Sequence, residues 1–286
     1  MINRLAIVGV GLIGGSLALA LKQAGAVGHV AGCGRNQKNL DKAVQLGVID
    51  SYEESISDAV KGADIVVLAV PLGAMQSVFV QIKDVIGDAT VITDVGSAKQ
   101  SVVDIASANL GPRIGQFVPG HPIAGTEKSG VEAGFASLYQ NRRVILTPLD
   151  STDPAAIARI DAMWRQCGAS VEYLGVGHHD KVLAATSHLP HMLAYALVNY
   201  LSRLNDHEEI FNYAAGGFRD FTRIASSDPV MWRDICISNG DALLTLIEGY
   251  KNELDQVSAA IRDADHEHLL QLFGKAKSER DSLIGL

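Results

Sequence analysis

The first 174 residues alternate short runs of apolar, often β-branched residues with longer stretches that have helical spacing. This alternation is typical of a mostly parallel sheet whose strands are joined by helices. The run from Ala63 to Val70 is apolar without alternation, as in a strand that is buried on both faces. We expect strands over residues 5–8, 29–31, 65–70, 91–94, 116–118, 144–147 and 171–173.

The β pattern stops after Gly175, and the rest of the chain has helical periodicity. Residues 178–204 predict one long helix with a kink at Pro190. Further helices are expected over residues 208–215, 229–237, 240–261 and 265–282, with Asp228 as the N-cap before Pro229. No segment rich in Pro and Ser separates the halves. We therefore expect an α/β domain over residues 1–172 and an all-α domain over residues 173–286.

The helical half carries more apolar residues than one packed face requires. Leu243, Leu244, Leu246 and Ile247 follow one another closely, which favours burial against a second copy of the chain. We expect a homodimer formed by this domain, although a helical cap that is stable by itself is the alternative. Trp164 and Phe273 occur at helical spacing among apolar residues and are expected in the core.

A glycine-rich turn follows the first predicted strand. Gly9, Gly11 and Gly14 have the G-x-G-x-x-G spacing, and an apolar helical stretch begins directly after them. In such a turn the first glycine allows a sharp bend, the second lets the backbone approach a pyrophosphate, and the third allows close packing of the helix on the strand. The context of strand, turn and helix predicts a dinucleotide-binding, doubly wound Rossmann-type domain. A glycine turn without a ligand is the alternative.

The end of the second predicted strand indicates which dinucleotide is preferred. An enzyme that uses NAD usually has Asp or Glu there to bind the ribose 2′-hydroxyl. Here Gly34 and Arg35 occupy the position, with Lys38 close by. Because a guanidinium pairs well with a phosphate, we expect NADP to be preferred over NAD. The alternative is that Arg35 stacks on adenine and that both cofactors are used.

Two polar clusters follow strand ends in the α/β half. Residues 93–99 follow one strand at the edge where open α/β sheets bind ligands, and residues 120–130 follow another. His121 lies between a glycine and a proline, so its position in the loop is restricted, and its ordinary pKa suits proton transfer near neutral pH.

A third cluster lies in the helical half. His188 and His191 are three residues apart on one predicted helix, and Arg219 and Arg223 are four apart. An arginine pair that faces a cleft binds carboxylates, whereas a pair that faces outward is solvated. The adjacent glycines and aromatic residues favour the carboxylate clamp.

These segments together resemble the prephenate and arogenate dehydrogenases, the TyrA-type enzymes of tyrosine biosynthesis. The resemblance runs through residues 9–15, 94–99, 120–130, 187–191 and 216–232, and the segments 120–127 and 187–191 are specific to that family. It implies a minimal two-domain form, without a chorismate mutase segment before Arg4 or an ACT domain after Leu286. Any inhibition by tyrosine would then be competitive at the active site.

The resemblance implies oxidative decarboxylation of a cyclohexadienol that carries a C4 hydroxyl and a ring carboxylate. His121 would accept a hydrogen bond from the C4 hydroxyl, Ser97 would align that hydroxyl with the nicotinamide, and Arg223 would bind the ring carboxylate. The expected substrate-binding residues are Arg223, His188, His191, Glu127, Thr126, Arg219 and Trp232. The expected cofactor-binding residues are Gly9, Gly11, Leu12, Ile13, Gly14, Gly34, Arg35, Val70, Pro71, Asp94 and Gly96.

Several alternatives stay open at this point. The His188 and His191 pair favours prephenate over arogenate, but one or two pocket residues could change that preference or allow both substrates. A β-hydroxyacid-type dehydrogenase has the same domain plan, but it would use a lysine base in the helical half. A dinucleotide-sensing regulator without turnover would not need His121, Ser97 and Arg223.

Composition excludes other classes of protein. The net charge of −8 argues against nucleic-acid binding, and we expect no membrane span, because the apolar run from Leu5 to Leu21 is interrupted by glycines. Three separated cysteines favour a reducing cytoplasm over a disulfide framework. We expect no metal site, and we assign His178, His179 and Asp180 to a helix surface or the substrate pocket.

Overall fold

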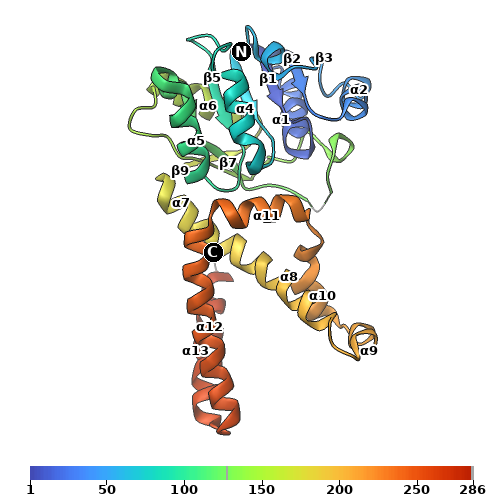
Figure 1. The fold of residues 1–286 in the computed structure, drawn as a ribbon, viewed down its shortest axis with the longest axis vertical. Coiled ribbons are helices and arrows are strands. Elements are labelled where there is room, and N and C mark those ends of the chain that lie inside the picture. The colour runs from blue at the N-terminus through green and yellow to red at the C-terminus, as the bar shows by residue number, and fades with distance from the viewer. Residues whose placement is uncertain (127, 285–286) are drawn as a thin grey trace. The chain divides into compact units, whose positions relative to one another are not determined.

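The computed structural model describes residues 1–126 and 128–284 (Figure 1). By its internal contacts the chain divides into two compact units, Met1–Gly240 and Asp241–Leu286. The boundary of these units lies downstream of the domain boundary at residues 172 and 173 that we expect from the sequence, which stays a prediction. No helix among the described residues is long and apolar enough to span a bilayer.

A six-stranded parallel sheet forms the centre of the larger unit. Its strands are β1 (Ile2–Val8), β2 (Val27–Cys33), β3 (Ser51–Tyr52), β4 (Ile65–Leu68), β5 (Val91–Asp94) and β6 (Phe117–Val118). Their order is β3-β2-β1-β4-β5-β6. The chain therefore builds outward from β1 through β2 to β3 and then returns to the other side of β1. This reversal makes the crevice at the ends of β1 and β4 the expected ligand site of a doubly wound fold.

Two apolar cores cover the two faces of this sheet. The helices of the α/β part are α1 (Leu12–Gln23), α2 (Gln37–Gln45), α3 (Ile56–Val60), α4 (Met75–Ile82), α5 (Gln100–Leu110) and α6 (Pro154–Gln166). Leu17 and Trp164 pack in the core on one face, and Phe79 and Val102 pack in the core on the other. Trp164 is fully buried, as the sequence predicts. The helices on both faces explain why the strands read as continuous apolar runs.

A second sheet contains three strands and carries His121. β7 (Gly120–Pro122) pairs antiparallel with β8 (Arg143–Leu146), which pairs parallel with β9 (Ser170–Tyr173). The sequence predicts the last two strands, but it places them in the parallel sheet and leaves residues 120–122 in a loop, and both expectations are wrong. Pro122 ends a short strand, where its missing N–H does not break a ladder.

The helical part of the larger unit begins after β9. Its elements are α7 (Val176–Leu183), a π-helical turn η4 (Ala184–His188), α8 (Leu189–Leu201), α9 (His207–Asn212), α10 (Gly216–Thr222), a 3₁₀ turn η5 (Arg223–Ser226) and α11 (Pro229–Ser238). The predicted single helix over residues 178–204 is therefore interrupted by a wide turn just before Pro190. Proline lacks the N–H that an α-helix needs, and a change of turn type accommodates that loss.

Short 3₁₀ turns complete the larger unit, and one of them contacts α11. These turns are η1 (Leu72–Ala74), η2 (Gly111–Gln116) and η3 (Val131–Ala133). The carboxylate of Asp234 on α11 accepts a hydrogen bond from the N–H of Gly73 in η1 at 3.0 Å. Asp228 caps α11 by accepting from the N–H groups of Val230 and Met231, as the sequence predicts.

The smaller unit consists of two helices. α12 spans Gly240–Arg262 and α13 spans His266–Ile284. Several of their large apolar side chains are exposed: Leu244, Leu254, Ile261, Leu270 and Phe273. Phe273 is 58% exposed, so the expectation that it lies in the core is wrong. Its helical spacing marks a face of the helix, but spacing does not say whether the same chain covers that face.

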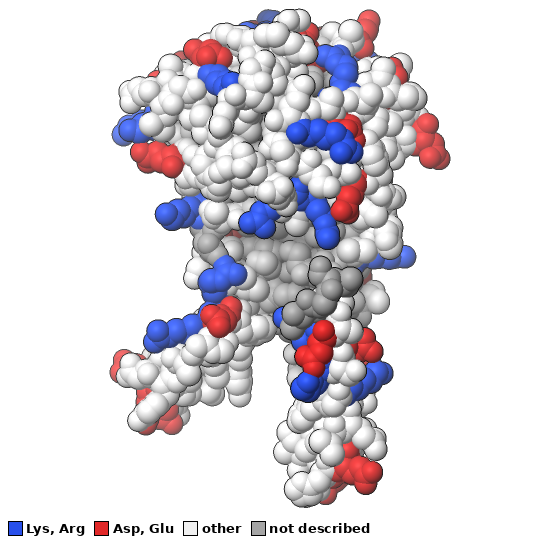
Figure 2. Space-filling view, turned by 180° about the vertical axis from the view of Figure 1, so that it is seen from behind, with Lys and Arg blue, Asp and Glu red and all other residues white. Residues whose placement is uncertain are grey.

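The surface carries charges of both signs. On the face that Figure 2 shows, Lys and Arg side chains are interspersed with Asp and Glu, in keeping with the net charge of −8.

Candidate active site

The glycine turn after β1 has the shape that a dinucleotide needs. Gly9 has φ +101°, and a Cβ there would lie 2.2 Å from the carbonyl oxygen of Ala69. A Cβ on Gly14 would lie 2.4 Å from the carbonyl oxygen of Gly9, whereas a Cβ on Gly11 would meet no atom within 4 Å. Gly9 and Gly14 are therefore required by packing, while Gly11 leaves open space beside the backbone.

The start of α1 faces that open space without a side-chain cap. Gly11 is the N-cap residue, and among the described residues no side chain caps the first turn of the helix. The N–H groups of Leu12, Ile13 and Gly14 belong to this turn, where an α-helix has no internal acceptors. Backbone donors at a helix N-terminus suit a pyrophosphate, so these residues fit the dinucleotide that the sequence predicts.

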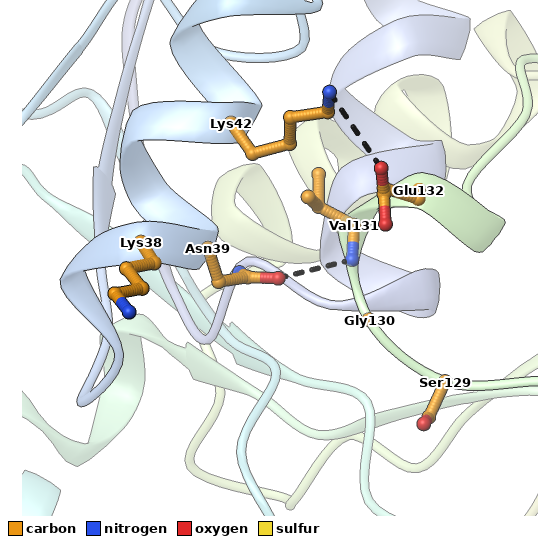
Figure 3. Close-up of a pocket in the computed structure, with 7 residues that line it drawn as sticks. All are labelled: Lys38, Asn39, Lys42, Ser129, Gly130, Val131 and Glu132. Carbon is orange, nitrogen blue, oxygen red and sulfur yellow. Dashed lines mark hydrogen bonds and ion pairs between the residues drawn. The ribbon is translucent and has the colours of Figure 1, made fainter.

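Asn39 connects the glycine turn to the loop that follows His121 (Figure 3). Its Nδ2 donates to the carbonyl oxygen of Val10 at 2.6 Å, and its Oδ1 accepts from the N–H of Val131 at 3.2 Å. A surface cavity of about 330 Å³ lies beside it, lined by Lys38, Asn39, Lys42 and residues 129–132. The side chain of Asn39 therefore holds two segments of the predicted site in register.

The end of β2 exposes basic side chains. Gly34 is half-buried, whereas Arg35 and Lys38 are exposed. The side chain of Asn36 accepts from the N–H of Asn39 and caps α2. Burial raises the pKa of the Cys33 thiol, and the carboxylate of Glu53, which follows β3, contributes to that rise. A carboxylate thus lies near this strand end, although the residues directly after β2 carry none.

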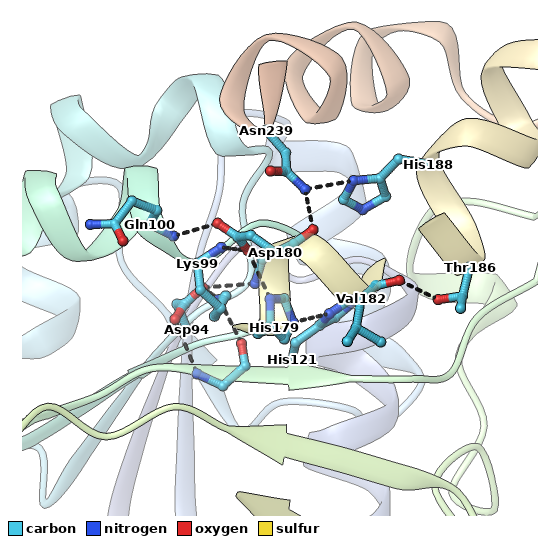
Figure 4. A network of polar contacts seen from close by, with 12 residues as sticks. Asp94, Lys99, Gln100, His121, His179, Asp180, Val182, Thr186, His188 and Asn239 are labelled. Carbon is cyan, nitrogen blue, oxygen red and sulfur yellow. Dashed lines mark hydrogen bonds and ion pairs between the residues drawn. The ribbon is translucent and has the colours of Figure 1, made fainter. Parts of the chain in front are cut away.

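A buried ion pair joins the end of β5 to β7 (Figure 4). Asp94 and Lys99 are fully buried, and the ammonium of Lys99 donates to Asp94 and, at 2.7 Å, to the carbonyl oxygen of Gly120. The carboxylate of Asp94 also accepts from the N–H groups of Gly96 and Gly120. Burial lowers the pKa of Lys99, although Asp94 and Asp180 oppose that shift. Both oxygens of Asp94 are thus occupied by protein donors.

His121 is buried against a second histidine. Its ring is 8% exposed, and its Nδ1 lies 2.9 Å from Nε2 of His179, whose side chain is fully buried on α7. Nδ1 of His179 lies 2.8 Å from a carboxylate oxygen of Asp180. Burial lowers the pKa of His121 well below its ordinary value, and the neighbouring His179, Lys99 and His188 act in the same direction. At neutral pH the imidazole of His121 is therefore uncharged, and its ring nitrogen without a proton can accept one.

Asp180 also holds the start of α5. Its two carboxylate oxygens accept from the N–H groups of Lys99, at 2.7 Å, and Gln100, at 2.8 Å. Burial acts to raise the pKa of Asp180, but hydrogen bonds from His179 and from these two N–H groups outweigh it, and the pKa lies below its ordinary value. The residue is therefore a carboxylate that three N–H donors orient, two from the main chain at the start of α5 and one from His179.

His188 and His191 both lie against Trp232. The ring of His191 stacks on the indole at 3.8 Å between centroids, and the ring of His188 meets it edge-on at 6.1 Å. Nδ1 of His188 lies 3.1 Å from Nδ2 of Asn239, and the backbone of Ser97 also interacts with the His188 ring. Nε1 of Trp232 is buried and has no hydrogen-bond partner among the described residues. Burial lowers the pKa of His188 to about 4. The buried N–H of Trp232 is therefore available to donate to a bound ligand.

The remaining predicted residues lie around these groups or apart from them. Ser97 and Val70 are half-buried at the ends of β5 and β4, Pro71 is exposed, and Gly96 is buried. Thr126 is exposed, as are Arg219 on α10 and Arg223 at the start of η5, and Glu127 lies outside the described residues. α10 ends between the two arginines, so they do not share one α-helix as the spacing suggests. Among the described residues, no group of three or more His, Cys, Asp or Glu side chains is arranged to hold a metal ion.

Comparison with protein families agrees with this geometry. Residues 17–173 match the nucleotide-binding domain of prephenate dehydrogenase, and residues 176–275 match its dimerization domain. The chain belongs to the prephenate dehydrogenase family. The resemblance inferred from the sequence is thereby confirmed, together with an α/β Rossmann-type domain followed by a helical one.

Individual members of the family are similar over nearly the whole chain. Cyclohexadienyl dehydrogenase of Zymomonas mobilis is 39% identical, over 98% of this chain and 96% of its own. Prephenate dehydrogenase of Bacillus subtilis is 38% identical, over 99% of this chain and 76% of its own. The crystal structure of prephenate dehydrogenase from Aquifex aeolicus, in complex with hydroxyphenyl propionate and NAD⁺, superposes with a TM-score of 0.91 at 38% identity, covering 99% of both chains.

Sequence reasoning left His179 and Asp180 between a helix surface and the substrate pocket, and it did not consider Asn239. His179 is buried although its neighbour His178 is exposed, and Asp180 and Asn239 complete the polar network around the two predicted histidines. Asp180 and Leu183, both buried on α7, lie three residues apart and mark its inner face. That helical spacing was the available signal, but it does not indicate which polar groups the inner face would meet.

Proposed function

We propose that this chain is a prephenate dehydrogenase that converts prephenate to 4-hydroxyphenylpyruvate with NAD(P). The observation that carries the proposal is the position of His121. His121 follows Gly120 on β7, and the N–H of Gly120 donates to Asp94 at the carboxyl end of β5. β5 belongs to the six-stranded sheet, whose strand β1 leads into the open glycine turn. A proton acceptor beside a dinucleotide cradle suits the oxidation of an alcohol.

We assign separate residues to cofactor binding and to catalysis. The glycine turn, Gly34, Arg35, Val70, Pro71 and Gly96 would hold the dinucleotide, with Asp94 beneath them. When bound, the nicotinamide supplies the acceptor for the hydride that leaves C4 of the substrate. His121 accepts a hydrogen bond from the C4 hydroxyl, and Ser97 aligns that hydroxyl.

Loss of CO₂ makes the ring aromatic, so the carboxylate needs a cation that does not protonate it. Arg223 would bind the ring carboxylate, since a guanidinium stays charged and matches a carboxylate with two donors. The buried N–H groups of His188 and Trp232 offer further donors to substrate oxygens, and His191, Arg219, Thr126 and Glu127 complete the proposed substrate site. The support for Trp232 is that its indole nitrogen is buried without a partner among the described residues, and the support for His188 is that its ring lies against this indole.

We propose NADP as the preferred cofactor. Arg35 and Lys38 are exposed directly after β2, and residues 34–36 contain no carboxylate to repel a 2′-phosphate. The carboxylate of Glu53, close to Cys33, opposes this preference, and cofactor kinetics decide between the two influences.

The decisive experiment is steady-state kinetics with prephenate and with arogenate, each with NADP and with NAD. We expect the highest kcat/KM with prephenate and NADP. Because the similar protein of Zymomonas mobilis is a cyclohexadienyl dehydrogenase, comparable kcat/KM with both substrates is the second candidate outcome. An enzyme that turned over neither substrate would refute the proposal.

We also propose a homodimer in a reducing compartment such as the cytoplasm. The exposed apolar side chains on α12 and α13 support the dimer, and three free cysteines support the compartment. Light scattering after gel filtration should give twice the mass of 30.4 kDa. A mass of one chain at micromolar concentration would contradict the dimer.

A further inference from the structure

We propose that Asp180 and His179 are positioning residues that fix which nitrogen of His121 carries its proton. This proposal rests on the function proposed above, and it adds a directional relay of hydrogen bonds from Asp180 through His179 to His121. The relay leaves the lone pair of His121 Nε2 free for the C4 hydroxyl of the substrate. Figure 4 shows the side chains of Asp180, His179 and His121 next to one another, with dashed lines for their contacts.

Asp180 determines which atoms donate and which accept in the relay. Its carboxylate accepts the main-chain N–H groups of Lys99 at 2.7 Å and Gln100 at 2.8 Å, and a main-chain N–H can only donate. Since the carboxylate is acceptor-only, the contact at 2.8 Å with Nδ1 of His179 requires a proton on that nitrogen.

The second step follows from the chemistry of imidazole. With one ring proton, placed on Nδ1, His179 has a lone pair on Nε2. The contact of 2.9 Å between this nitrogen and Nδ1 of His121 then requires a proton on Nδ1 of His121. With its single proton there, His121 has its own lone pair on Nε2. No hydrogen bond to Nε2 of His121 occurs among the described residues.

This tautomer is the one that the reaction requires. As the hydride leaves C4, the hydroxyl proton moves to Nε2 of His121 and the C4–O bond becomes a carbonyl. When the bond to the carboxylate breaks, its electron pair enters the ring and the oxygen takes the proton back to become a phenol. The proton is therefore held on His121 only between the two steps, and the carboxylate of Asp180 stabilises the charge through His179.

The groups around His121 come from several elements. Asp94 ends β5, Lys99 precedes α5, His179 and Asp180 lie on α7, and His188 ends the π-helical turn. Lys99 is neutralised by Asp94, so the charge that is linked to His121 by hydrogen bonds is that of Asp180. Main-chain donors at the start of α5 fix this carboxylate, which makes the relay rigid.

The test compares three variants. His179→Leu removes the acceptor for Nδ1 of His121, whereas His179→Gln can place its amide oxygen near the lost Nε2. His178→Leu is the matched control, because His178 is the exposed neighbour on the same helix. We expect His179→Leu to lower kcat by about 10²-fold or more at nearly unchanged KM. His179→Gln should recover most of that loss, and His178→Leu should match the wild type.

A second measurement does not depend on turnover. Long-range ¹H–¹⁵N NMR of the ligand-free protein, with His121→Asn used for assignment, reports which nitrogen of His121 is protonated. We expect Nδ1–H in the wild type. In Asp180→Asn, the amide can donate to Nδ1 of His179 and reverse both hydrogen bonds, which should move the proton of His121 to Nε2 and lower kcat.

These outcomes separate the two proposals. If the wild type turned over neither substrate, the proposed function would fail, while an Nδ1–H tautomer that Asp180→Asn reverses would still support the relay. The relay is overturned if His121 carries its proton on Nε2 in the wild type, or if folded His179→Leu keeps the wild-type kcat. Should His179→Leu not fold, the tautomers in the wild type and in Asp180→Asn decide.

Discussion

The main-chain nitrogen of Gly73 lies 3.0 Å from a carboxylate oxygen of Asp234, 161 residues further along the chain. A Cβ on Gly73 would lie 2.7 Å from the same oxygen, so any other residue here would have to displace the Asp234 side chain. The other carboxylate oxygen accepts from the guanidinium of Arg233 at 2.6 Å. A helix of the C-terminal half thus holds the turn that follows Pro71, where we expect the dinucleotide to bind.

Removing this carboxylate should loosen the turn. Asp234→Ala leaves the N–H of Gly73 without its acceptor, so we expect a loss of about 1–3 kcal/mol in the free energy of unfolding and a raised KM for the dinucleotide. Asp234→Asn keeps an acceptor and should lose less. Urea denaturation and cofactor kinetics measure both effects. Equal stability of Asp234→Ala and the wild type would show that the contact contributes nothing.

The glycine turn allows a test in which folding and binding separate. Gly9→Ala combines a positive φ with a contact of 2.2 Å to Ala69, and it should destabilise the protein by about 1–3 kcal/mol. Gly11→Ala has open space around its Cβ, so it should fold normally but raise the KM for the dinucleotide about tenfold or more, because the methyl group occupies the ligand's side. Thermal melts and kinetics distinguish the two variants, and normal cofactor KM in Gly11→Ala would remove the pyrophosphate from this position.

His121→Asn should lower kcat by at least about 10²-fold, since it removes the proton acceptor. Steady-state kinetics measure this loss, and a kcat near that of the wild type would contradict the assignment.

The pH dependence of the wild-type enzyme tests the same residue. Because the pKa of His121 lies well below its ordinary value of 6.5, the imidazole stays uncharged at pH 6.5. We therefore expect kcat/KM to hold its value down through pH 6.5 and to fall only at lower pH. An inflection at or above pH 6.5 would assign the base to another group.

His188 should link folding to pH. Its pKa is about 4 when folded, against the ordinary value of 6.5, so the unfolded chain binds the proton first as the pH falls. The contribution of neutral His188 to the free energy of unfolding is fully present above pH 6.5. It is lost progressively toward pH 4, by roughly 3 kcal/mol in total. Urea denaturation at pH 7 and pH 4.5 should show a smaller pH effect in His188→Asn than in the wild type. The same pH effect in both proteins would show that His188 is not held neutral.

Arg35→Ala tests the cofactor preference. If the guanidinium binds a 2′-phosphate, its loss should raise the KM for NADP by about tenfold to a hundredfold and leave the KM for NAD within about twofold. Glu53→Gln is the companion variant, because it removes the nearby carboxylate and should improve the use of NADP. Equal effects of Arg35→Ala on both cofactors would place Arg35 against the adenine instead.

The sequence predicts the parts of this fold that depend on local pattern. The strand over residues 91–94 agrees at both ends, and the N-cap at Asp228 is as expected, because periodicity and capping are properties of neighbouring residues. The second sheet was not predicted. Residues 120–122 form a strand only because β8, more than twenty residues later, pairs with them.

The candidate site shows the same division. His121 was recognised from its place between Gly120 and Pro122, since the segment has a family pattern. Its contact with His179 was not predicted, because the contact joins residues 58 positions apart and helical spacing does not indicate which group the inner face of α7 meets. Burial of His179 follows from the packing of α7 beside the start of α5, and only the folded chain shows that Asp180 meets Lys99 and Gln100 there.

The π-helical turn at Ala184–His188 acts as a one-residue insertion within a helix. Each residue of an α-helix rotates the following side chains by about 100°. One extra residue between Asp180 and His191 therefore turns the downstream face by about that angle, so the two halves of the helix present their histidines in different directions. A single-residue deletion within this turn would restore a regular helix and turn His188 away from Asn239, so the contact between these two residues depends on the length of this segment.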